Sequence, residues 1–144
     1  MIMYAVIRIR GTVKIAPKIS TTLELMNLKR VNNLTLMPEN DQNLQMIKMV
    51  QDYTTYGIIS DETLKELIEK RAFPIDEAKK VDAKKAFADI KAGKKVSEAG
   101  IYNCFRMSPP RKGYERKGIK KPFKLGGAAG DRKEKINDLI MRMI

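Results

Sequence analysis

Hydrophobic and polar positions alternate over residues 3–10. The two sets are Met3, Ala5, Ile7 and Ile9 on one side and Tyr4, Val6, Arg8 and Arg10 on the other. A period of two with β-branched residues predicts a half-buried strand. We expect Arg8 and Arg10 to project from the face opposite Ile7, near the C-terminal end of this strand.

A short helix is predicted after this strand. Thr21 and Glu24 have the spacing of a capping box, in which two side chains satisfy backbone amides at a helix start. Lys29 and Arg30 then fall at the C-terminal end of the helix, where the helix dipole favours cations.

The order strand, helix, strand, helix, strand fills the first part of the chain. Residues 34–37 and 54–59 predict the second and third strands, and Asn40 or Asp41 can cap the helix between them. This order is typical of an α+β, ferredoxin-like split β-α-β sandwich. We expect residues 1–59 to form a core domain that stays folded, although weakened, without the rest.

Residues 60–100 predict a helical insertion of nearly balanced charge. Ser60 caps its first helix, and a second helix runs over residues 77–92 with Gly93 as its C-cap. The apolar positions are Leu64, Leu67 and Ile68 in the first helix and Val81, Phe87 and Ile90 in the second.

Residues 101–144 form a basic extension that ends in a helix. Residues 101–107 alternate again and predict a strand, whereas residues 106–130 are rich in proline and glycine and have no amphipathic period. Asp131 caps the last helix, whose apolar stripe is Ile136, Leu139, Ile140 and Met143. Because such a stripe must dock, the basic stretch before it is held at both ends.

The net charge of +12 lies at both ends of the chain. Residues 1–36 hold six basic and one acidic side chain, residues 37–105 eleven and twelve, and residues 106–144 twelve and four. Two separated basic blocks suggest one polyanion contacted by two parts of the fold. The competing interpretation is a generically soluble basic protein.

The chain has no histidine and a single cysteine, Cys104. The commonest general base and metal ligand is therefore missing, and neither an internal disulfide nor a zinc cage can form. Cys104 is interpreted as a small packed side chain rather than a nucleophile. No apolar stretch approaches the roughly 20 residues that span a bilayer, and no secretory signal is evident. We expect a cytoplasmic protein without membrane contact, cofactor or catalytic activity.

The strongest functional motif is the basic stretch 106–124. It holds eight basic residues and one acid, Glu115, with Tyr114 and Phe123 interleaved. Basic side chains supply phosphate contacts, and an aromatic ring can stack on an unpaired base. RNA contact is favoured over the alternative, a disordered linker kept soluble by lysine.

Residues 126–130, Gly-Gly-Ala-Ala-Gly, directly precede the last helix. Bare amides at a helix start can bind a phosphate, but the lysine and hydroxyl residue of a phosphate loop are missing. The favoured interpretation is a turn that brings the backbone close to a phosphate or to a neighbouring element.

Several stretches together carry a family resemblance. The first are Tyr-Ala-Val-Ile-Arg-Ile-Arg-Gly (4–11), Leu-Lys-Arg-Val-Asn (28–32), Asp-Tyr-Thr-Thr-Tyr-Gly (52–57) and Leu-Ile-Glu-Lys-Arg (67–71). The strongest are Phe-Arg-Met-Ser-Pro-Pro-Arg-Lys-Gly (105–113), Gly-Gly-Ala-Ala-Gly-Asp-Arg (126–132) and Ile-Asn-Asp-Leu-Ile-Met-Arg-Met (136–143). They resemble the large-subunit ribosomal protein family numbered thirty in bacteria and seven in eukaryotes, and the insertion, tail and short N-terminus are similar to the archaeal form.

The resemblance implies a three-stranded antiparallel sheet with two helices on one face, bound to ribosomal RNA and without catalytic activity. The expected partners are large-subunit rRNA, with 5S rRNA as a further candidate, and neighbouring large-subunit proteins. The residues that it implies in RNA contact are Arg8, Arg10, Lys14, Lys29, Arg30, Asn32, Arg106, Pro109, Pro110, Arg111 and Lys112. The predicted RNA-binding set further includes Lys18, Tyr114, Arg116, Lys117, Lys120, Lys121, Lys124 and Arg132.

One position departs from the family pattern. Members often carry a glycine before the Met-Ile of the second helix, where the backbone can approach RNA closely, but this chain has Gln45 there. A close backbone approach is therefore not expected at Gln45.

Two other function classes compete with a structural rRNA-binding protein. A DNA-binding or nucleoid protein is expected to show a dimer interface or a base-reading helix, and neither is evident. An RNA-processing enzyme needs a general base or a metal site, against which the missing histidines and the lack of an acidic cluster count.

Overall fold

The protein is described from a computed structural model, which covers every residue except 1, 2, 12, 76, 77, 79 and 81. The strands are β1 (Met3–Arg8), β2 (Asn33–Pro38), β3 (Thr54–Ile58), β4 (Phe105–Arg106) and β5 (Gly130–Asp131). The helices are α1 (Pro17–Leu25), α2 (Asp41–Met49), α3 (Asp61–Arg71), α4 (Ala83–Lys91) and α5 (Ile136–Met143), with 3-10 turns η1 (Phe123–Leu125) and η2 (Lys133–Lys135).

The strands form one sheet in the order β4-β2-β1-β3-β5. β1 pairs antiparallel with both neighbours, so that Val6 lies opposite Thr35 of β2 and Tyr56 of β3. β4 adds an antiparallel edge to β2, and β5 adds a parallel edge to β3. The α+β class is confirmed, but the sheet has more than the three strands expected, and one edge is parallel. β4 and β5 have two residues each, too few for a period of two to mark them.

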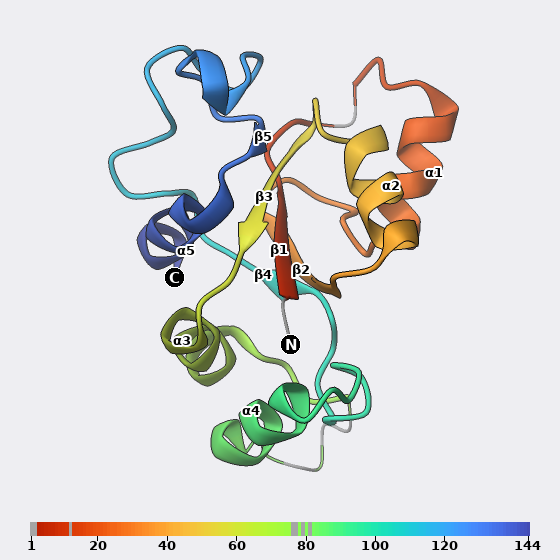
Figure 1. The fold of residues 1–144 in the computed structure, drawn as a ribbon, viewed down its shortest axis with the longest axis vertical. Helices are drawn as coiled ribbons and strands as arrows, with labels where there is room; N and C mark the ends of the chain where they lie inside the picture. Colours follow the sequence, from red (N-terminus) through yellow and green to blue (C-terminus); the bar gives the residue numbers. More distant parts are fainter. Residues whose placement is uncertain (1–2, 12, 76–77, 79, 81) are drawn as a thin grey trace.

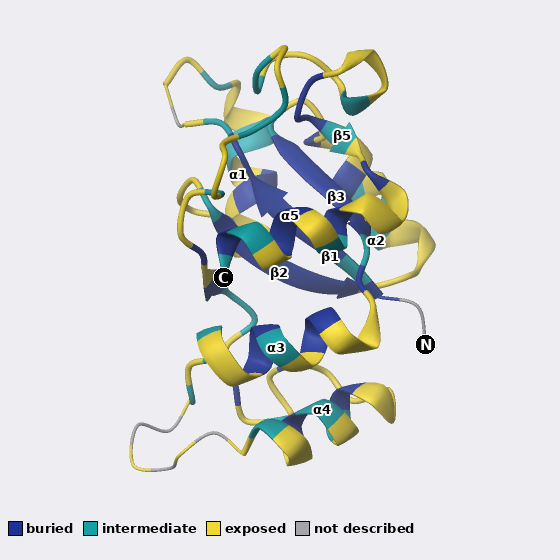
Figure 2. Cartoon of the chain, turned by 90° about the vertical axis from the view of Figure 1, so that its left-hand side faces the viewer, coloured by how far each residue is buried: buried dark blue, intermediate teal, exposed yellow. Residues whose placement is uncertain are grey.

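Helices cover both faces of the sheet. Figure 1 shows α1 and α2 on one side of the strands and α5 on the other, with α3 and α4 at the lower end. Under α1 and α2 the buried cluster is Val6, Leu23, Met26, Leu28, Met37, Ile47, Val50 and Tyr56. The alternating residues Met3, Ala5, Ile7 and Ile9 belong to the larger cluster on the opposite face. The alternation is confirmed, but the half-buried strand is wrong, because β1 is buried on both faces (Figure 2).

Helix α1 begins at Pro17, ahead of the predicted start at Thr21. Proline suits the first helical position, since its missing amide has no partner there in any helix. The Thr21 hydroxyl donates to the Pro17 carbonyl at 2.9 Å, so the predicted capping box is wrong. The helix ends at Leu25. Lys29 and Arg30 therefore lie in the connection to β2, beyond the helix terminus expected to hold them.

The starts of α2 and α3 follow the sequence closely. Of the two predicted caps of α2, Asn40 accepts a backbone amide, and Ser60 does so at the start of α3, as predicted. The helix predicted over residues 77–92 begins too early: α4 starts at Ala83, where the Asp82 side chain accepts the Lys84 and Lys85 amides. The predicted C-cap Gly93 lies just past its end at a φ of +94°. The predicted apolar position Val81 lies outside the described residues.

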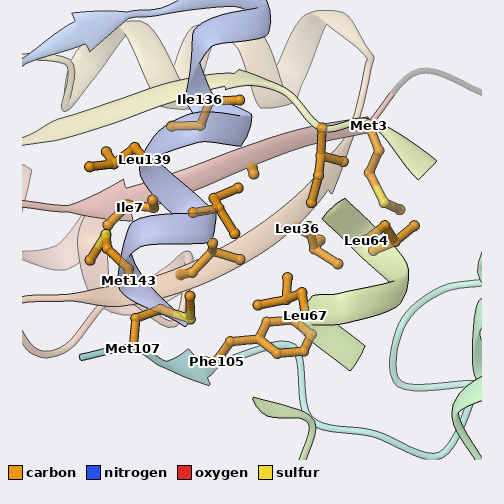
Figure 3. Close-up of a cluster of buried hydrophobic side chains, with 14 of the residues drawn as sticks. Met3, Ile7, Leu36, Leu64, Leu67, Phe105, Met107, Ile136, Leu139 and Met143 are labelled. Carbon is orange, nitrogen blue, oxygen red and sulfur yellow. The ribbon is translucent and has the colours of Figure 1, made fainter. Parts of the chain in front are cut away.

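Helix α5 docks on the sheet through the predicted stripe. Ile136, Leu139, Ile140 and Met143 are fully buried, and Figure 3 shows Leu139 and Met143 packed around Ile7. The turn before α5 crosses β3 at Gly57, where an added Cβ would lie 2.1 Å from the Lys133 carbonyl oxygen. A glycine is therefore required for this approach.

Two expectations about the last region need correction. The strand predicted over residues 101–107 is reduced to β4, and Ile101 forms a separate antiparallel bridge with Pro74. Asp131 does not cap α5. Its carboxylate accepts the Lys133 amide at 2.8 Å in the turn η2, which precedes the helix.

Candidate nucleic-acid interface

Most of the predicted RNA-binding cations are exposed. Those of the N-terminal block lie on the connections around α1 and in its first turn: Lys14, Lys18, Lys29 and Arg30. Those of the tail are Arg106, Arg111, Lys112, Arg116, Lys117, Lys120, Lys121 and Lys124. The β1–α1 connection and the tail both lie at the upper end of the molecule in Figures 1 and 2, whereas α4 lies at the lower end. The two basic blocks thus share one end of the protein.

Two hydrogen bonds to Asn32 join the two blocks. The Tyr114 hydroxyl donates to the Asn32 side-chain oxygen at 2.8 Å, and the Met107 amide donates to the Asn32 carbonyl at 3.1 Å. The Tyr114 ring is half-buried against the larger core cluster, and this burial raises the pKa of its hydroxyl. Stacking of Tyr114 on a base stays a prediction, which this packed position does not favour.

Arg8 is buried, not solvated as expected. It is 3% exposed, and its guanidinium donates to the Leu28 carbonyl at 2.8 Å and to the Arg10 carbonyl at 2.9 Å. Burial lowers the pKa of Arg8. The connection after α1 covers this end of β1, so Arg8 supports the backbone that carries Lys29 and Arg30. An RNA contact by Arg8 stays a prediction without support from its position.

Arg10 is half-buried at the edge of the same surface. Its guanidinium carbon lies 4.8 Å from the centroid of the Tyr53 ring, a cation–π contact. The Arg10 amide also donates to the Tyr53 carbonyl at 3.3 Å. Both contacts with Tyr53 hold this predicted RNA-binding cation in place.

An ion pair anchors the tail to the sheet. Arg132 is 3% exposed, and both terminal nitrogens of its guanidinium donate to the Glu115 carboxylate. It also donates to the Thr55 hydroxyl at 2.7 Å and the Ala128 carbonyl at 3.1 Å. The ring of Phe123 lies 4.9 Å from the guanidinium carbon. A buried guanidinium needs such partners, and rRNA contact by Arg132 stays a prediction that these engaged donors do not favour.

Glu115 has an anchoring role in the structure that the sequence pattern does not predict. Burial raises the pKa of its carboxyl, but the hydrogen bond from Arg132 and the charges of Arg132 and Arg142 outweigh burial and lower it overall. Arg142 in turn donates to the Gly113 carbonyl at 2.9 Å. A single acid among eight cations was the available signal, since repulsion among the cations gives such an acid a structural use.

The glycine stretch before α5 packs against the tail itself. The amides of residues 127–129 donate in order to the carbonyls of Pro122, Gly118 and Lys121, at 2.9, 3.0 and 3.1 Å. An added Cβ on Gly127 would lie 2.0 Å from the Lys121 carbonyl oxygen. Close approach to a neighbouring segment is confirmed, and the phosphate-loop interpretation is wrong because these amides already have partners.

Two further exposed cations extend the basic end. Lys133 and Lys135 lie in the turn η2, and the Lys135 ammonium is 5.5 Å from the centroid of the Phe123 ring. The sequence pattern predicts a helix start here and no binding role for these lysines. The density of lysine directly after Arg132 was the signal.

Other chemistry finds little support in the part of the chain that the structure describes. No group of three acidic or cysteine side chains there is arranged to hold a metal ion, and none of its helices is long and apolar enough to cross a bilayer. Cys104 is half-buried, and burial raises the pKa of its thiol. Gln45 is exposed on α2.

The comparison with known proteins decides the family. The family model described as Ribosomal protein L30p/L7e matches residues 4–54, from β1 to the start of β3. The large ribosomal subunit protein uL30 of Nanoarchaeum equitans is 42% identical over the full length of both chains. The chain belongs to the L30p/L7e family.

Other members of the family match over nearly the whole length. The uL30 protein of Methanococcus maripaludis is 41% identical over 98% of this chain and 99% of its own. That of Aeropyrum pernix is 34% identical over the full length of both. The resemblance drawn from the sequence motifs is confirmed, including its archaeal character. These L30p/L7e relatives also span the insertion and the tail, which the family model does not cover.

Proposed function

We propose that the chain is a structural constituent of the large ribosomal subunit that binds and stabilises folded rRNA. The observation that carries this proposal is the shared end of the two basic blocks, in a chain whose full-length relatives are named large ribosomal subunit proteins. The hydrogen bond between Tyr114 and Asn32 fixes the distance between the blocks. One folded RNA can therefore be gripped at two places, which stabilises its shape.

The chemistry of the surface is that of a binding protein rather than an enzyme. The exposed groups at the basic end are lysines and arginines, which neutralise phosphates but supply no general base near neutral pH. The chain has no histidine to take that role. Large-subunit rRNA and neighbouring large-subunit proteins are the proposed partners, and 5S rRNA is a further candidate that the same binding assays test.

A salt titration tests the RNA contact. The probe is the fragment of large-subunit rRNA that the wild-type protein protects from ribonuclease. Replacing Lys120, Lys121 and Lys124 together by glutamine should weaken binding and reduce the slope of log affinity against log salt by roughly 2–3 units, because each lost contact releases about one counterion fewer. The matched control replaces the exposed lysines Lys84, Lys85 and Lys95 of the insertion and should leave the slope unchanged.

Two results would contradict the proposal. The first is a wild-type protein that protects no rRNA fragment and does not sediment with high-salt-washed large subunits. The second is equal or tighter binding to duplex DNA at the same salt concentration, which would favour the nucleoid alternative. An unchanged slope for the tail variant alone would shift the RNA contact to the N-terminal block.

A further inference from the structure

A hollow of about 410 Å³ opens beside the β4 edge of the sheet. It is lined by Phe73, Pro74, Tyr102, Cys104 and Arg106. Of these residues, only Arg106 belongs to the predicted RNA-binding set. The volume falls within the range of about 300–1,000 Å³ that is typical of pockets for small organic groups.

The backbone sets the two aromatic rings of the hollow opposite each other. Pro74 and Ile101 form an antiparallel bridge, and the Tyr102 amide donates to the Phe73 carbonyl at 3.0 Å. The Ile75 amide donates to a carbonyl of the facing segment at 3.0 Å as well. In this register Phe73 and Tyr102 are cross-strand neighbours, so their side chains project from the same face.

Residues 101–107 alternate between the core and solvent, and those that line the hollow lie on the solvent side. Ile101 and Phe105 point into the core and are 1% and 0% exposed. Tyr102 therefore lies on the side away from the core, and it is 53% exposed, as Phe73 is 48% exposed. As neighbours across the bridge, the two open rings place apolar surface together beside the hollow, and contiguous apolar patches on soluble proteins mark interaction sites.

The charges around the hollow are positive. Arg106 is exposed on its wall, and the Arg71 guanidinium, which donates to the Ser108 hydroxyl at 2.7 Å, lies beside the Arg106 carbonyl at 3.4 Å. Burial raises the pKa of the Cys104 thiol, and the charges of Arg106 and Lys29 oppose that rise. Among the residues that the structure describes, no acidic side chain lines the hollow. Its occupant is therefore expected to combine a flat apolar surface with negative charge.

We propose that this hollow takes one unpaired nucleobase of the bound RNA, stacked on Tyr102 or Phe73, while Arg106 contacts the adjoining phosphate. An apolar side chain of a neighbouring protein would fill the same space but would leave the surrounding cations without a counter-charge. The proposal rests on the proposed function and adds a contact beside the basic end. Stacking of this kind is tolerant of base identity, because every base has a π-face.

Substitution of the rings tests the proposal with the protected rRNA fragment as the probe. Tyr102→Leu and Phe73→Leu keep apolar bulk but remove the flat ring. At least one of them should weaken binding about 5- to 100-fold with an unchanged salt slope, since stacking releases no counterions. Tyr102→Phe keeps the ring and should bind as the wild type does. Met141→Ala, which shortens an apolar side chain 43% exposed on α5, is the matched control.

Cys104 provides a readout that needs no substitution. It is the single cysteine of the chain and lines the hollow. Its reaction with an aromatic disulfide reagent should therefore slow when the wild-type protein binds the fragment, and a duplex DNA that the protein does not bind should leave the rate unchanged. An unaltered rate in the RNA complex would overturn the proposal.

The failure of this proposal can be told from failure of the proposed function. If the tail lysine variant loses affinity while both leucine variants bind as the wild type does, RNA binding stands and the base site is wrong. If the leucine variants bind the fragment normally but are lost from reconstituted large subunits, a protein fills the hollow, and the base site is again wrong. If the wild type protects no fragment, the proposed function itself fails.

Discussion

The two faces of the sheet are built in different ways. The face under α1 and α2 is covered by residues close in sequence to the strands, and the family model over residues 4–54 contains all of that cover. The opposite face is covered by residues that follow β3, from the insertion and the tail. The helices that follow β3 therefore complete the core, and the chain cannot be understood as a small domain with loose additions.

Truncation after Ile59 should destabilise the protein more than any substitution, because it removes the whole cover of the second face. The sequence alone predicts a folded but weakened domain of residues 1–59. Because Ile7 and Leu36 would lose their cover on the second face, we now expect the fragment to lack a stable fold, since a sheet with one bare apolar face is marginal. Proton NMR of residues 1–59 should show poor dispersion, in contrast to the full chain.

The control for the truncation is a fragment of residues 1–59 with α1 and α2 intact and polar substitutions at Met3 and Leu36. If solubility was the only defect, this variant regains dispersed signals. A wild-type fragment with dispersed methyl and amide signals would restore the autonomous domain.

The second largest effect is expected for Ile7→Ala. Ile7 is fully buried on the second face, and loss of its side chain should reduce the free energy of unfolding by about 2–5 kcal/mol through the cavity left behind. If Arg8 were exposed to solvent, as the half-buried strand predicts, its substitution by alanine would be nearly neutral. Its buried contact with the Leu28 carbonyl now predicts a loss of about 1–3 kcal/mol. Denaturant titration of both variants measures the order, and a larger loss for Arg8→Ala would contradict it.

Gly57→Ala should destabilise the contact between β3 and the turn before α5. An added Cβ meets the Lys133 carbonyl and the Ile136 side chain, so the second face must open slightly, at a cost of about 1–3 kcal/mol. Gly11→Ala is the matched control, because nothing lies within 4 Å of its added Cβ. Equal thermal midpoints for the two variants would show that α5 is free to shift.

The smallest effect is expected for Glu115→Gln, and it should depend on pH. The pKa of Glu115 is lowered in the folded state, so its carboxylate stabilises the fold above its unfolded pKa of about 4.3, and this contribution disappears as the pH falls through the folded value. At pH 7 the variant should be less stable by about 1–2 kcal/mol. The difference should shrink as the pH is lowered below about 4.3, and a difference constant with pH would contradict the ion pair.

The sequence predicts the parts of this fold that carry a local signal, either a regular hydrophobic repeat or a capping residue. The stripe of α5, the alternation of β1 and the caps Asn40 and Ser60 are all found as expected. Position in space is different, because a period gives the direction of a side chain but not what covers it. The alternation places Arg8 on the correct face, yet the connection after α1 covers this face, and no local pattern predicts that cover.

The candidate site divides in the same way. Basic composition marks the lysines of the tail, which are exposed. It cannot separate Arg132, which is held by Glu115, from cations that face solvent. The aromatic residues show the same limit, since Tyr114 in the basic stretch is packed while Tyr102 outside it is open. Burial depends on contacts between segments far apart in sequence, and composition carries no record of these.

The two outer strands, β4 and β5, limit self-association of the free protein through its sheet edges. A long bare strand edge is a template for pairing with another chain. On the outer edge of β2, β4 pairs only with Asn33 and Leu34. Further along this edge, the Asn103 side chain accepts the Leu36 amide at 3.0 Å and donates to the Leu36 carbonyl at 2.9 Å. On the outer edge of β3, past the residues that pair with β5, the Asn137 side chain accepts the Ser60 amide at 2.9 Å and donates to the Ile58 carbonyl at 3.3 Å. Two asparagines thus finish the hydrogen bonding that two short strands begin, which leaves the sheet little with which to aggregate before it meets RNA.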